Sequence, residues 1–402
     1  MRLTTAGTPL GFSRPVVGRI ARSGGAADLR SESIRVLNEP VSPSDVVGYR
    51  ALLTKLRQSE LGPLADAAIP IIHSLREDDH LHDDYIVFVQ PSSGFVRTVY
   101  RPDSTHNALF LTERCSSNCL MCSQPPKDKD DTDYLFGANL ELVRMIAPGP
   151  DYLGITGGEP TLLGERLLTL LGSLRDSCPN THVHMLTNGR VFAWPTFTRK
   201  FMAVGHPSLT LGIPLYSDDP IIHNYVVQAR DAFDQTVMGL HELARWNQEI
   251  EIRVVLHRLT IPRLVQLAEY IYRNLPFVAR VALMGLEPTG YTPRNKDKLW
   301  IDPVEYQDVL EQAVEFLSIR GMNVSIYNLQ LCVTRPSLWK FARKSISDWK
   351  NIFLPECTKC GKVDQCGGLF QSAERMHSAH IHALPCDSAA ATIQDHAVQN
   401  AR

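Results

Sequence analysis

Between residues 107 and 286 the chain alternates short apolar strands with amphipathic helices, and this alternation limits the fold more than any other feature. Strands are expected at 108–112, 152–156, 182–186, 209–215, 251–257 and 280–286, with helices at 139–146, 163–176, 194–204, 231–246 and 264–274. Repeated strand–helix units predict a parallel sheet with right-handed crossovers, either open or curved into a full or partial barrel. Ligands of such sheets gather at the carboxyl ends of the strands.

The 402-residue chain has room for further regions on both sides of this core. Residues 48–75 contain a helix-like stretch, and the segments 85–90 and 95–100 around Pro91-Ser-Ser-Gly predict a β-hairpin. Downstream, Asp302-Pro-Val-Glu is typical of a capped helix start. We therefore expect an N-terminal α/β extension (1–105), a core (106–300), a C-terminal helix and strand region rich in cysteine (301–386) and a tail (387–402).

Composition excludes several classes of protein. Lys and Arg number 41 against 43 for Asp and Glu, a net charge of -2 that argues against a nucleic-acid partner. No apolar run approaches the ~18 residues of a membrane helix, and the N-terminus lacks the apolar core of a signal peptide. Clustered thiols in a reducing compartment are more often metal ligands or redox groups than disulfides. A cytoplasmic protein with no membrane partner is expected.

Three cysteines follow the first expected strand directly: Cys115, Cys119 and Cys122, with the spacing C-x3-C-x2-C. This position puts their thiols at the edge of the sheet where ligands gather. A [4Fe–4S] cube has four irons to ligate, so three thiolates leave one iron for another ligand. An open position of this kind is typical of catalytic metal sites. A zinc site completed by a distant fourth ligand remains the alternative.

The second expected strand ends in Thr156-Gly-Gly-Glu-Pro-Thr, where two glycines allow close approach to the backbone and Glu159 adds a carboxylate. Alone, this is an ordinary strand-ending turn. Together with the cysteine loop, it resembles the radical S-adenosylmethionine (SAM) superfamily, whose signatures are C-x3-C-x2-C after strand one and GGEP after strand two. Met121 stands where an aromatic residue is usual, and its flexible thioether can pack against an adenine ring.

The resemblance implies a partial (β/α)6 radical-SAM barrel in which the three cysteines bind a [4Fe–4S] cluster and SAM chelates the fourth iron. It implies SAM contacts from seven residues: Gly157, Gly158, Glu159, Pro160, Asn188, Ser217 and Arg253. The chemistry implied is reductive cleavage of SAM to a 5′-deoxyadenosyl radical, which removes hydrogen from a substrate C–H bond. No catalytic side chain is assigned.

A second cysteine set lies near the C-terminus: Cys357, Cys360 and Cys366 in C-x2-C-x5-C, with Cys332 upstream and Cys386 downstream. Four thiolates at such spacings fit a zinc knuckle or an iron–sulfur cluster. C-x2-C-x5-C also resembles part of the auxiliary-cluster domain of peptide-modifying radical SAM enzymes, although the C-x3-C that follows there is missing. We expect one auxiliary [4Fe–4S] cluster on Cys332, Cys357, Cys360 and Cys366, with Cys386 in reserve and zinc as the alternative.

Four further phrases, at 119–126, 284–291, 325–332 and 345–351, resemble the HxsC family of radical SAM maturases in the His-Xaa-Ser repeat peptide system. This resemblance implies a ribosomally made peptide substrate, a companion radical SAM maturase and an electron donor such as flavodoxin or ferredoxin. It makes Glu287, Tyr291 and Asn328 candidate substrate-side residues. The alternatives are a small-molecule substrate, an activase of a glycyl-radical enzyme and a zinc-dependent interaction module.

Two smaller expectations concern side chains near this site. The charged stretch 127–133 is expected to be a solvated loop, although it lies close enough in sequence to cover the cysteine loop. His182 and His184 share one face of the third strand, where a core or lining position is expected.

Overall fold

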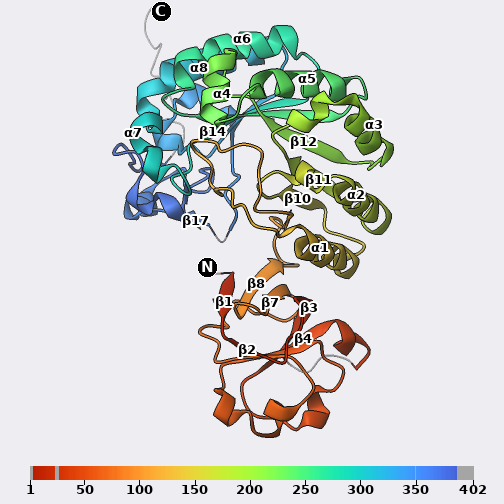
Figure 1. Ribbon diagram of the computed structural model, residues 1–402. Helices are drawn as coiled ribbons and strands as arrows, with labels where there is room; N and C mark the ends of the chain where they lie inside the picture. The colour runs from red at the N-terminus through yellow and green to blue at the C-terminus, as the bar shows by residue number, and fades with distance from the viewer. Residues whose placement is uncertain (1–2, 23–26, 349, 387–402) are drawn as a thin grey trace, which may run out of the picture.

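The computed structural model describes residues 3–22, 27–348 and 350–386. The expected tail at 387–402 lies outside these residues. Figure 1 shows two bodies: the N-terminal strands form one below, and the alternating strands and helices form a larger one above, with the C-terminal segment on its flank. Helix α1 (Thr132–Ile146) lies on the side of the larger body that faces the N-terminal strands.

The core sheet has eight parallel strands that follow one another in chain order. They are β9 (Ala108–Phe110), β10 (Tyr152–Thr156), β11 (His182–Leu186), β12 (Leu209–Pro214), β13 (Glu249–Leu256), β14 (Arg280–Gly285), β15 (Val324–Tyr327) and β16 (Ala342–Arg343). All six predicted strands are present, and β15 and β16 extend the sheet at one edge. The predicted α/β class with a parallel sheet is confirmed.

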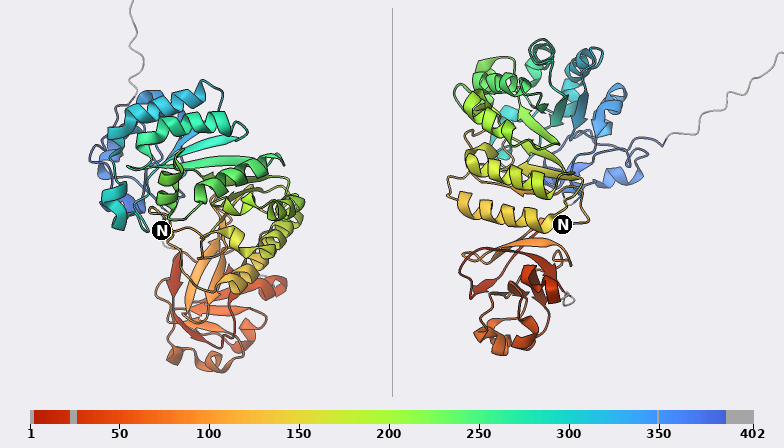
Figure 2. Two further views of the ribbon diagram at one scale, coloured as in Figure 1. Left: turned by 45° about the horizontal axis from the view of Figure 1, so that its top comes forward. Right: turned by 90° about the vertical axis from the view of Figure 1, so that its right-hand side faces the viewer.

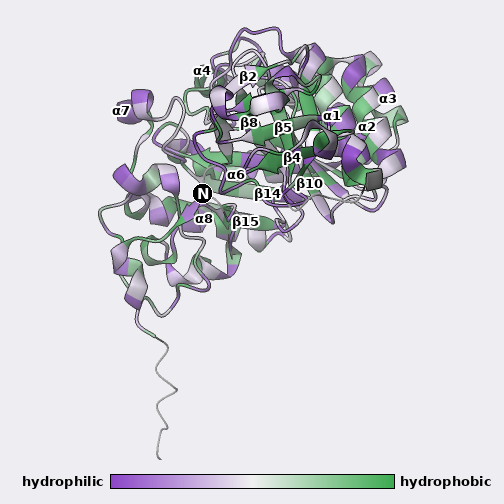
Figure 3. Cartoon of the chain, turned by 90° about the horizontal axis from the view of Figure 1, so that it is seen from below, coloured by the Kyte–Doolittle hydropathy of each residue, from purple (hydrophilic) through white to green (hydrophobic). Residues whose placement is uncertain are grey.

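Helices cover the outer face of this curved sheet (Figures 1 and 2). They are α1, α2 (Glu165–Ser177), α3 (Pro195–Ala203), α4 (Pro220–Val227), α5 (Ala232–Ala244), α6 (Leu264–Asn274), α7 (Lys296–Leu299) and α8 (Gln307–Ser318). Short 3-10 helices occur between them at Pro160–Leu163, Arg190–Ala193, Ile261–Arg263, Pro293–Asn295 and Pro303–Tyr306. Alternate strand residues such as Leu153, Val183 and Ile252 pack with the helices in one apolar core. Figure 3 shows the strands as mainly hydrophobic, while the helices carry both hydrophobic and hydrophilic residues.

Local capping explains two helix starts. Glu305 accepts the Asp302 N–H (3.0 Å) and Asp302 accepts the Val304 N–H (3.2 Å), so the predicted capping box before α8 is confirmed. The unpredicted helix α4 begins after Asp219, whose Oδ1 accepts the Ile221 N–H at 2.8 Å.

The N-terminal strands form a second sheet in the order β1-β8-β7-β3-β4-β5-β6-β2. They are β1 (Thr4–Ala6), β2 (Thr8–Leu10), β3 (Val16–Ala21), β4 (Ser33–Leu37), β5 (Ala51–Thr54), β6 (Ile71–His73), β7 (Ile86–Gln90) and β8 (Phe95–Tyr100). Gly7 alone separates β1 from β2, and these two strands pair with β8 and β6 at opposite ends of the strand order. The link at Gly7 therefore closes the sheet on itself. A Cβ at Gly7 would lie 2.4 Å from the His73 carbonyl oxygen, so this closure requires glycine.

The predicted hairpin of β7 and β8 is confirmed as an antiparallel pair, but the predicted helix-like stretch at 48–75 is wrong. This stretch contains β5 and β6, with 3-10 helices at Gln58–Glu60 and Gly62–Asp66. Every residue of β5 is buried, because Ala51 and Leu53 pack in one apolar cluster and Leu52 packs in another. A short strand buried on both faces has a continuous apolar run that periodicity alone does not separate from a helix. The remaining 3-10 helices of this region are Ala27–Glu32 and Pro43–Val46.

The C-terminal region is mostly irregular. It contains 3-10 helices at Leu331–Val333, Pro336–Phe341, Pro355–Lys359 and Gln371–Arg375, and a small antiparallel pair of β17 (Asn351–Ile352) and β18 (Leu369–Phe370). Arg101, just after β8, donates to both carboxylate oxygens of Asp348 at 2.7 and 3.0 Å. This bidentate pair joins the segment before the first core strand to the segment after the last one.

Candidate active site

The loop that carries Cys115, Cys119 and Cys122 follows β9, as predicted, and all three thiols are free and partly buried. Burial raises the pKa of Cys115 to about 11 and that of Cys119 to about 12. The neighbouring thiols contribute to both increases in pKa. Over residues 3–22, 27–348 and 350–386, no three His, Cys, Asp or Glu side chains are already gathered around one metal position.

Backbone contacts from two elements hold the cysteine loop. The N–H groups of Asn118 and Leu120 donate to carbonyls at the end of α4, at 3.0 and 2.9 Å. On the other side, the Tyr291 N–H donates to the Cys122 carbonyl at 2.9 Å. A Cβ at Gly290 would lie 2.1 Å from that same carbonyl, and Gly290 has a φ of +61°. The segment after β14 therefore packs directly on the third cysteine, through a glycine that no other residue could replace.

Asp131 holds the start of the loop. Its carboxylate is fully buried and accepts the Thr112 hydroxyl at 2.7 Å and the Glu113 N–H at 2.6 Å. The expectation of a solvated loop at 127–133 is right for residues 127–130, which are exposed, but wrong for Asp131. A run of charges in the sequence gave no sign that one of them turns inward.

The glycines of the GGEP turn bring the second strand end against the cysteine loop. A Cβ at Gly158 would lie 2.0 Å from the Arg114 carbonyl oxygen, and one at Gly157 would lie 2.7 Å from that of Thr112. The Gly158 N–H donates to the Thr112 carbonyl at 2.7 Å, and the Glu159 N–H donates to the Arg114 carbonyl at 2.8 Å. The two signature segments are thus in direct backbone contact.

Glu159 is 1% exposed, and its carboxylate accepts four hydrogen bonds. The donors are the N–H and hydroxyl of Thr161 (3.0 and 2.7 Å), the Thr187 hydroxyl (2.7 Å) and the Asn188 N–H (2.6 Å). Pro160 is also buried and begins the short helix that follows. The carboxylate therefore joins the ends of β10 and β11, which gives it a positioning role that its place in the sequence did not indicate.

Asn188 and Arg190 connect the third strand end to the cysteine loop. The Asn188 amide donates to the Ser116 hydroxyl at 2.9 Å, and the Arg190 guanidinium donates to the Ser116 carbonyl at 2.8 Å. Arg190 is also bound to Gln235 of α5 at 2.7 Å, and its charge lowers the pKa of Cys119 against the effect of burial. Sequence reasoning missed Arg190. The only signal was its position two residues after Asn188.

Ser217 and Arg253 occupy different parts of the sheet. Ser217 is buried beyond the end of β12, where its hydroxyl accepts the Asp219 N–H at 3.1 Å. Arg253 is within β13, where it donates to Glu251 at 2.6 Å and to the Met284 sulfur at 3.0 Å. Met121 packs with Leu120 and Tyr216 in a separate apolar cluster.

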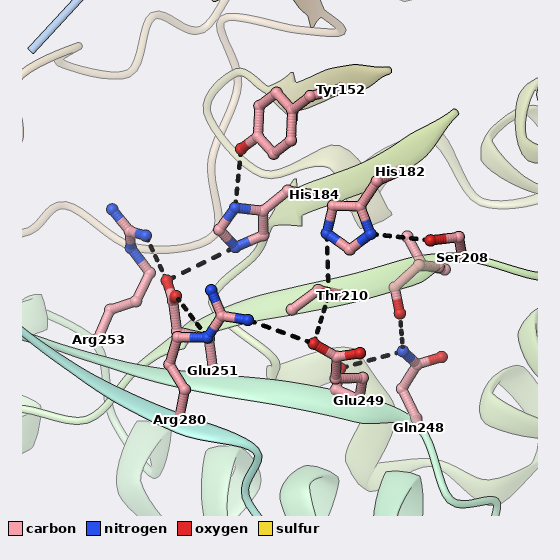
Figure 4. A network of polar contacts seen from close by, with 11 residues as sticks. Tyr152, His182, His184, Ser208, Thr210, Gln248, Glu249, Glu251, Arg253 and Arg280 are labelled. Atoms are coloured by element: carbon pink, nitrogen blue, oxygen red, sulfur yellow. Dashed lines mark hydrogen bonds and ion pairs between the residues drawn. The ribbon is translucent and has the colours of Figure 1, made fainter. Parts of the chain in front are cut away.

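The inner face of β10 to β14 carries a polar network, shown in Figure 4. At its centre the buried Glu251 faces Arg253, Arg280 (3.8 Å) and His184 (3.6 Å). The Tyr152 hydroxyl lies 3.0 Å from Nδ1 of His184, and burial lowers the pKa of His184 to about 4. His182 contacts Ser208 and Thr210 instead. Both histidines line the inner face, as expected, and His184 is neutral at pH 7.

Four C-terminal cysteines surround one small cavity of about 20 Å³: Cys332, Cys357, Cys360 and Cys366. A space of this size holds roughly one water molecule. His382 also lines it and donates a backbone hydrogen bond that lowers the pKa of Cys332, while burial raises that pKa. Cys386 is exposed and does not line the cavity, although its backbone packs on Gly361. All four cysteines that the spacing grouped line this cavity, although no three of them surround one metal position.

Residues 109–271 match the family model described as Radical SAM superfamily. This range runs from β9 into α6, and the similarity to the radical SAM superfamily therefore covers the three cysteines and residues 157–160. The superfamily that this model describes consists of enzymes that bind a [4Fe–4S] cluster and SAM. The chain's own donors fit: three free thiols from one loop, packed against the GGEP turn.

Several solved structures are similar to parts of this chain. SuiB of Streptococcus suis bound to S-adenosylmethionine is 16% identical, with a TM-score of 0.47, over 57% of this chain and 52% of SuiB. A radical SAM methyltransferase from Sphaerobacter thermophilus is 14% identical, with a TM-score of 0.46, over 62% of this chain and 73% of that one. anSMEcpe with bound AdoMet and the Cp18Cys peptide is 17% identical, with a TM-score of 0.42, over 55% of this chain and 62% of anSMEcpe. The chain spans about half the length of SuiB.

No curated protein matches the sequence significantly. Among the described helices, none has the length and apolar character needed to cross a membrane.

Proposed function

We propose that this protein is a radical SAM enzyme that modifies a ribosomally made peptide. The observation that carries the proposal is the backbone contact between the three-cysteine loop and the GGEP turn, at the carboxyl ends of β9 and β10. The similarity to the radical SAM superfamily over residues 109–271 supports the same chemistry.

In this proposal, Cys115, Cys119 and Cys122 hold the catalytic cluster. SAM contacts come from the predicted set: Gly157, Gly158, Glu159, Pro160, Asn188, Ser217 and Arg253. When bound, the cluster and SAM supply a 5′-deoxyadenosyl radical that removes hydrogen from the substrate. The chain's own residues set the geometry, because Glu159 holds the turn at Thr187 and Asn188, and Arg190 holds Ser116 within the cysteine loop.

We infer that the second cysteine set holds one auxiliary [4Fe–4S] cluster. Its support is the convergence of Cys332, Cys357, Cys360 and Cys366 on one cavity, which offers four thiols and so a complete ligand set. The small volume of that cavity favours a single zinc ion as the competing occupant. Metal analysis separates the two.

The sequence phrases shared with the HxsC family support the substrate assignment. We propose a His-Xaa-Ser repeat peptide as substrate, with a companion radical SAM maturase and a flavodoxin or ferredoxin as electron donor. In the same proposal, residues 1–105 form a separate N-terminal domain, 106–300 the catalytic core and 301–386 the auxiliary-cluster region. A small-molecule substrate is the runner-up, and SAM cleavage with a candidate peptide against a metabolite pool discriminates between the two.

Anaerobic reconstitution with iron and sulfide tests the proposal. Two [4Fe–4S] clusters predict about eight irons and eight sulfides per chain, and reduction in the presence of SAM should release 5′-deoxyadenosine. Zinc without iron would instead support an interaction module and refute the enzyme.

A further inference from the structure

A cavity of about 220 Å³ lies where the N-terminal sheet meets the core. β8 lines one side, α1 another, and β9 with the segment before it the third. Its apolar walls include Phe95, Tyr100, Phe110, Tyr134 and Ala138. The proposed cofactor sites use none of these residues, so this cavity is a separate feature of the molecule.

Arg97 of β8 is the distinctive side chain in this cavity. Its guanidinium is accessible, yet protein atoms crowd it closely enough to lower its pKa, as expected of a group that lines a hollow. It lies 5.5 Å from the centre of the Phe110 ring. Among the described residues, the Arg97 guanidinium has neither a hydrogen-bond partner nor an acidic partner within ion-pair distance.

The other charged groups of the cavity are already paired. Arg101 is bound to Asp348 and to the Ser104 hydroxyl. Glu113 attracts Arg97 from a distance, but its carboxylate is bound to Lys127 at 2.9 Å. An arginine stays protonated in any protein environment, so Arg97 presents a positive charge without an ion-pair partner at the cavity. An anionic ligand group would supply the missing partner.

A second, more open cavity of about 650 Å³ adjoins the first. The two share Val17, Phe88, Tyr134 and Ala138 as lining residues, and the second continues along the junction between α1 and the N-terminal strands. The first cavity also reaches Glu113, two residues before Cys115. Together they form a track that leads along the junction toward the start of the cysteine loop.

We propose that this junction binds an extended segment of the peptide substrate, with a side-chain carboxylate on Arg97 and an aromatic or aliphatic side chain beside it. The inference rests on the proposed function. The first cavity is smaller than the ~300–1,000 Å³ of sites for whole small molecules, and it suits one or two side chains. Guanidinium and carboxylate make strong, directional hydrogen bonds, so Arg97 sets the register of the segment.

A pair of peptides that differ only in charge provides the test. The probes are acetyl-phenylalanyl-aspartyl-phenylalanyl amide and its asparaginyl counterpart, with binding to the full chain followed by ligand-observed NMR. The wild-type protein should bind the aspartyl peptide about tenfold more tightly. Arg97→Gln should remove this preference, whereas Arg199→Gln, at an exposed arginine of α3, should keep it.

Ala138→Trp, which fills the wall shared by both cavities, should weaken both peptides, and thermal melting checks that each variant is folded. Equal binding of the two peptides to the wild-type protein would overturn the proposal, as would a preference that survives Arg97→Gln. These measurements need no SAM cleavage. Failure of the proposed function would appear separately, as absence of 5′-deoxyadenosine from the wild-type protein.

Discussion

The two cysteine sites of this molecule differ in how complete their ligand sets are. The first offers three thiols from a single loop at the carboxyl end of a strand, packed among backbone segments from α4, β10 and the chain after β14. The second draws four thiols from separate segments around one small cavity. A complete set satisfies a metal or cluster by itself, while an incomplete set needs a ligand from outside. In the proposed function, this difference assigns the chemistry to the first site, although both sites have the same residue type.

The largest expected effect comes from removing one ligand of the first site. Cys119→Ala should abolish 5′-deoxyadenosine formation, because two thiolates cannot hold the cluster in the geometry that SAM requires. Chromatographic measurement of 5′-deoxyadenosine checks this. Cys178→Ala, at a buried cysteine outside both sites, is the control and should retain activity. Residual 5′-deoxyadenosine formation in Cys119→Ala would mean that the three-thiol site is not the catalytic one.

The second site should lose its metal independently. Cys357→Ala combined with Cys360→Ala should remove about half of the iron and leave the first cluster measurable, since two separate ligand sets are involved. Iron and sulfide analysis gives the result. Loss of all the iron would mean that the cysteines do not form two separate sites.

Acid should destabilise the core beneath the first site. Burial holds the pKa of His184 at about 4, below its usual 6.5, so the unfolded chain binds the proton more readily. The contribution to stability is therefore complete above pH 6.5 and is lost as the pH falls toward 4, by at most about 3 kcal/mol. Urea unfolding at pH 7 and pH 5 measures it. His184→Gln should reduce this dependence, while His223 and His257, whose pKa values burial also lowers, keep the rest of it. An unchanged slope would contradict the assignment.

A smaller effect is expected at the carboxylate that joins two strand ends. Glu159→Gln replaces one acceptor oxygen by a donor, which leaves the Thr187 hydroxyl or the Asn188 N–H without a partner. We expect a loss of about 1–3 kcal/mol in the free energy of unfolding, together with weaker SAM binding. The metal content of the second site should stay unchanged. If SAM affinity is unaltered, Glu159 does not position the first site.

The smallest effect should follow from Arg190→Gln. It removes the contacts with Ser116 and Gln235, so the cysteine loop should loosen and SAM affinity should fall several-fold, by about 1 kcal/mol. Arg199→Gln serves as the matched control, because Arg199 is an exposed arginine of the same region. Titration of the reconstituted proteins with SAM compares the two. Equal SAM affinities of the two variants would show that Arg190 does not support the cysteine loop.

The sequence predicted the sheet well because its strands are regular: β10, β11 and α6 have the predicted bounds. The sequence-based prediction failed where a buried residue or element lacks the usual alternation of apolar and polar residues. β5 was predicted as helical, since a strand buried on both faces has no alternation. The buried Asp131 was hidden within a run of exposed charges, and α4 is short and apolar almost throughout.

The candidate site was also predicted only in part. Spacing along the chain grouped the cysteines of each set, and the first set is local in sequence, within one loop. The contacts of Glu159 with Thr187 and of Arg190 with Ser116 span 28 and 74 residues, and nothing local in the sequence encodes them. These long-range contacts depend on which strand ends lie side by side.

The central claim is that only the three-cysteine site has an iron open to SAM. Electron paramagnetic resonance of the reduced Cys357→Ala, Cys360→Ala protein, titrated with SAM, tests it most directly. The account predicts that SAM changes the spectrum of the remaining cluster, and that the variant with Ala at positions 115, 119 and 122 shows no such response. A spectrum that SAM leaves unchanged in the first protein, or alters in the second, would contradict it.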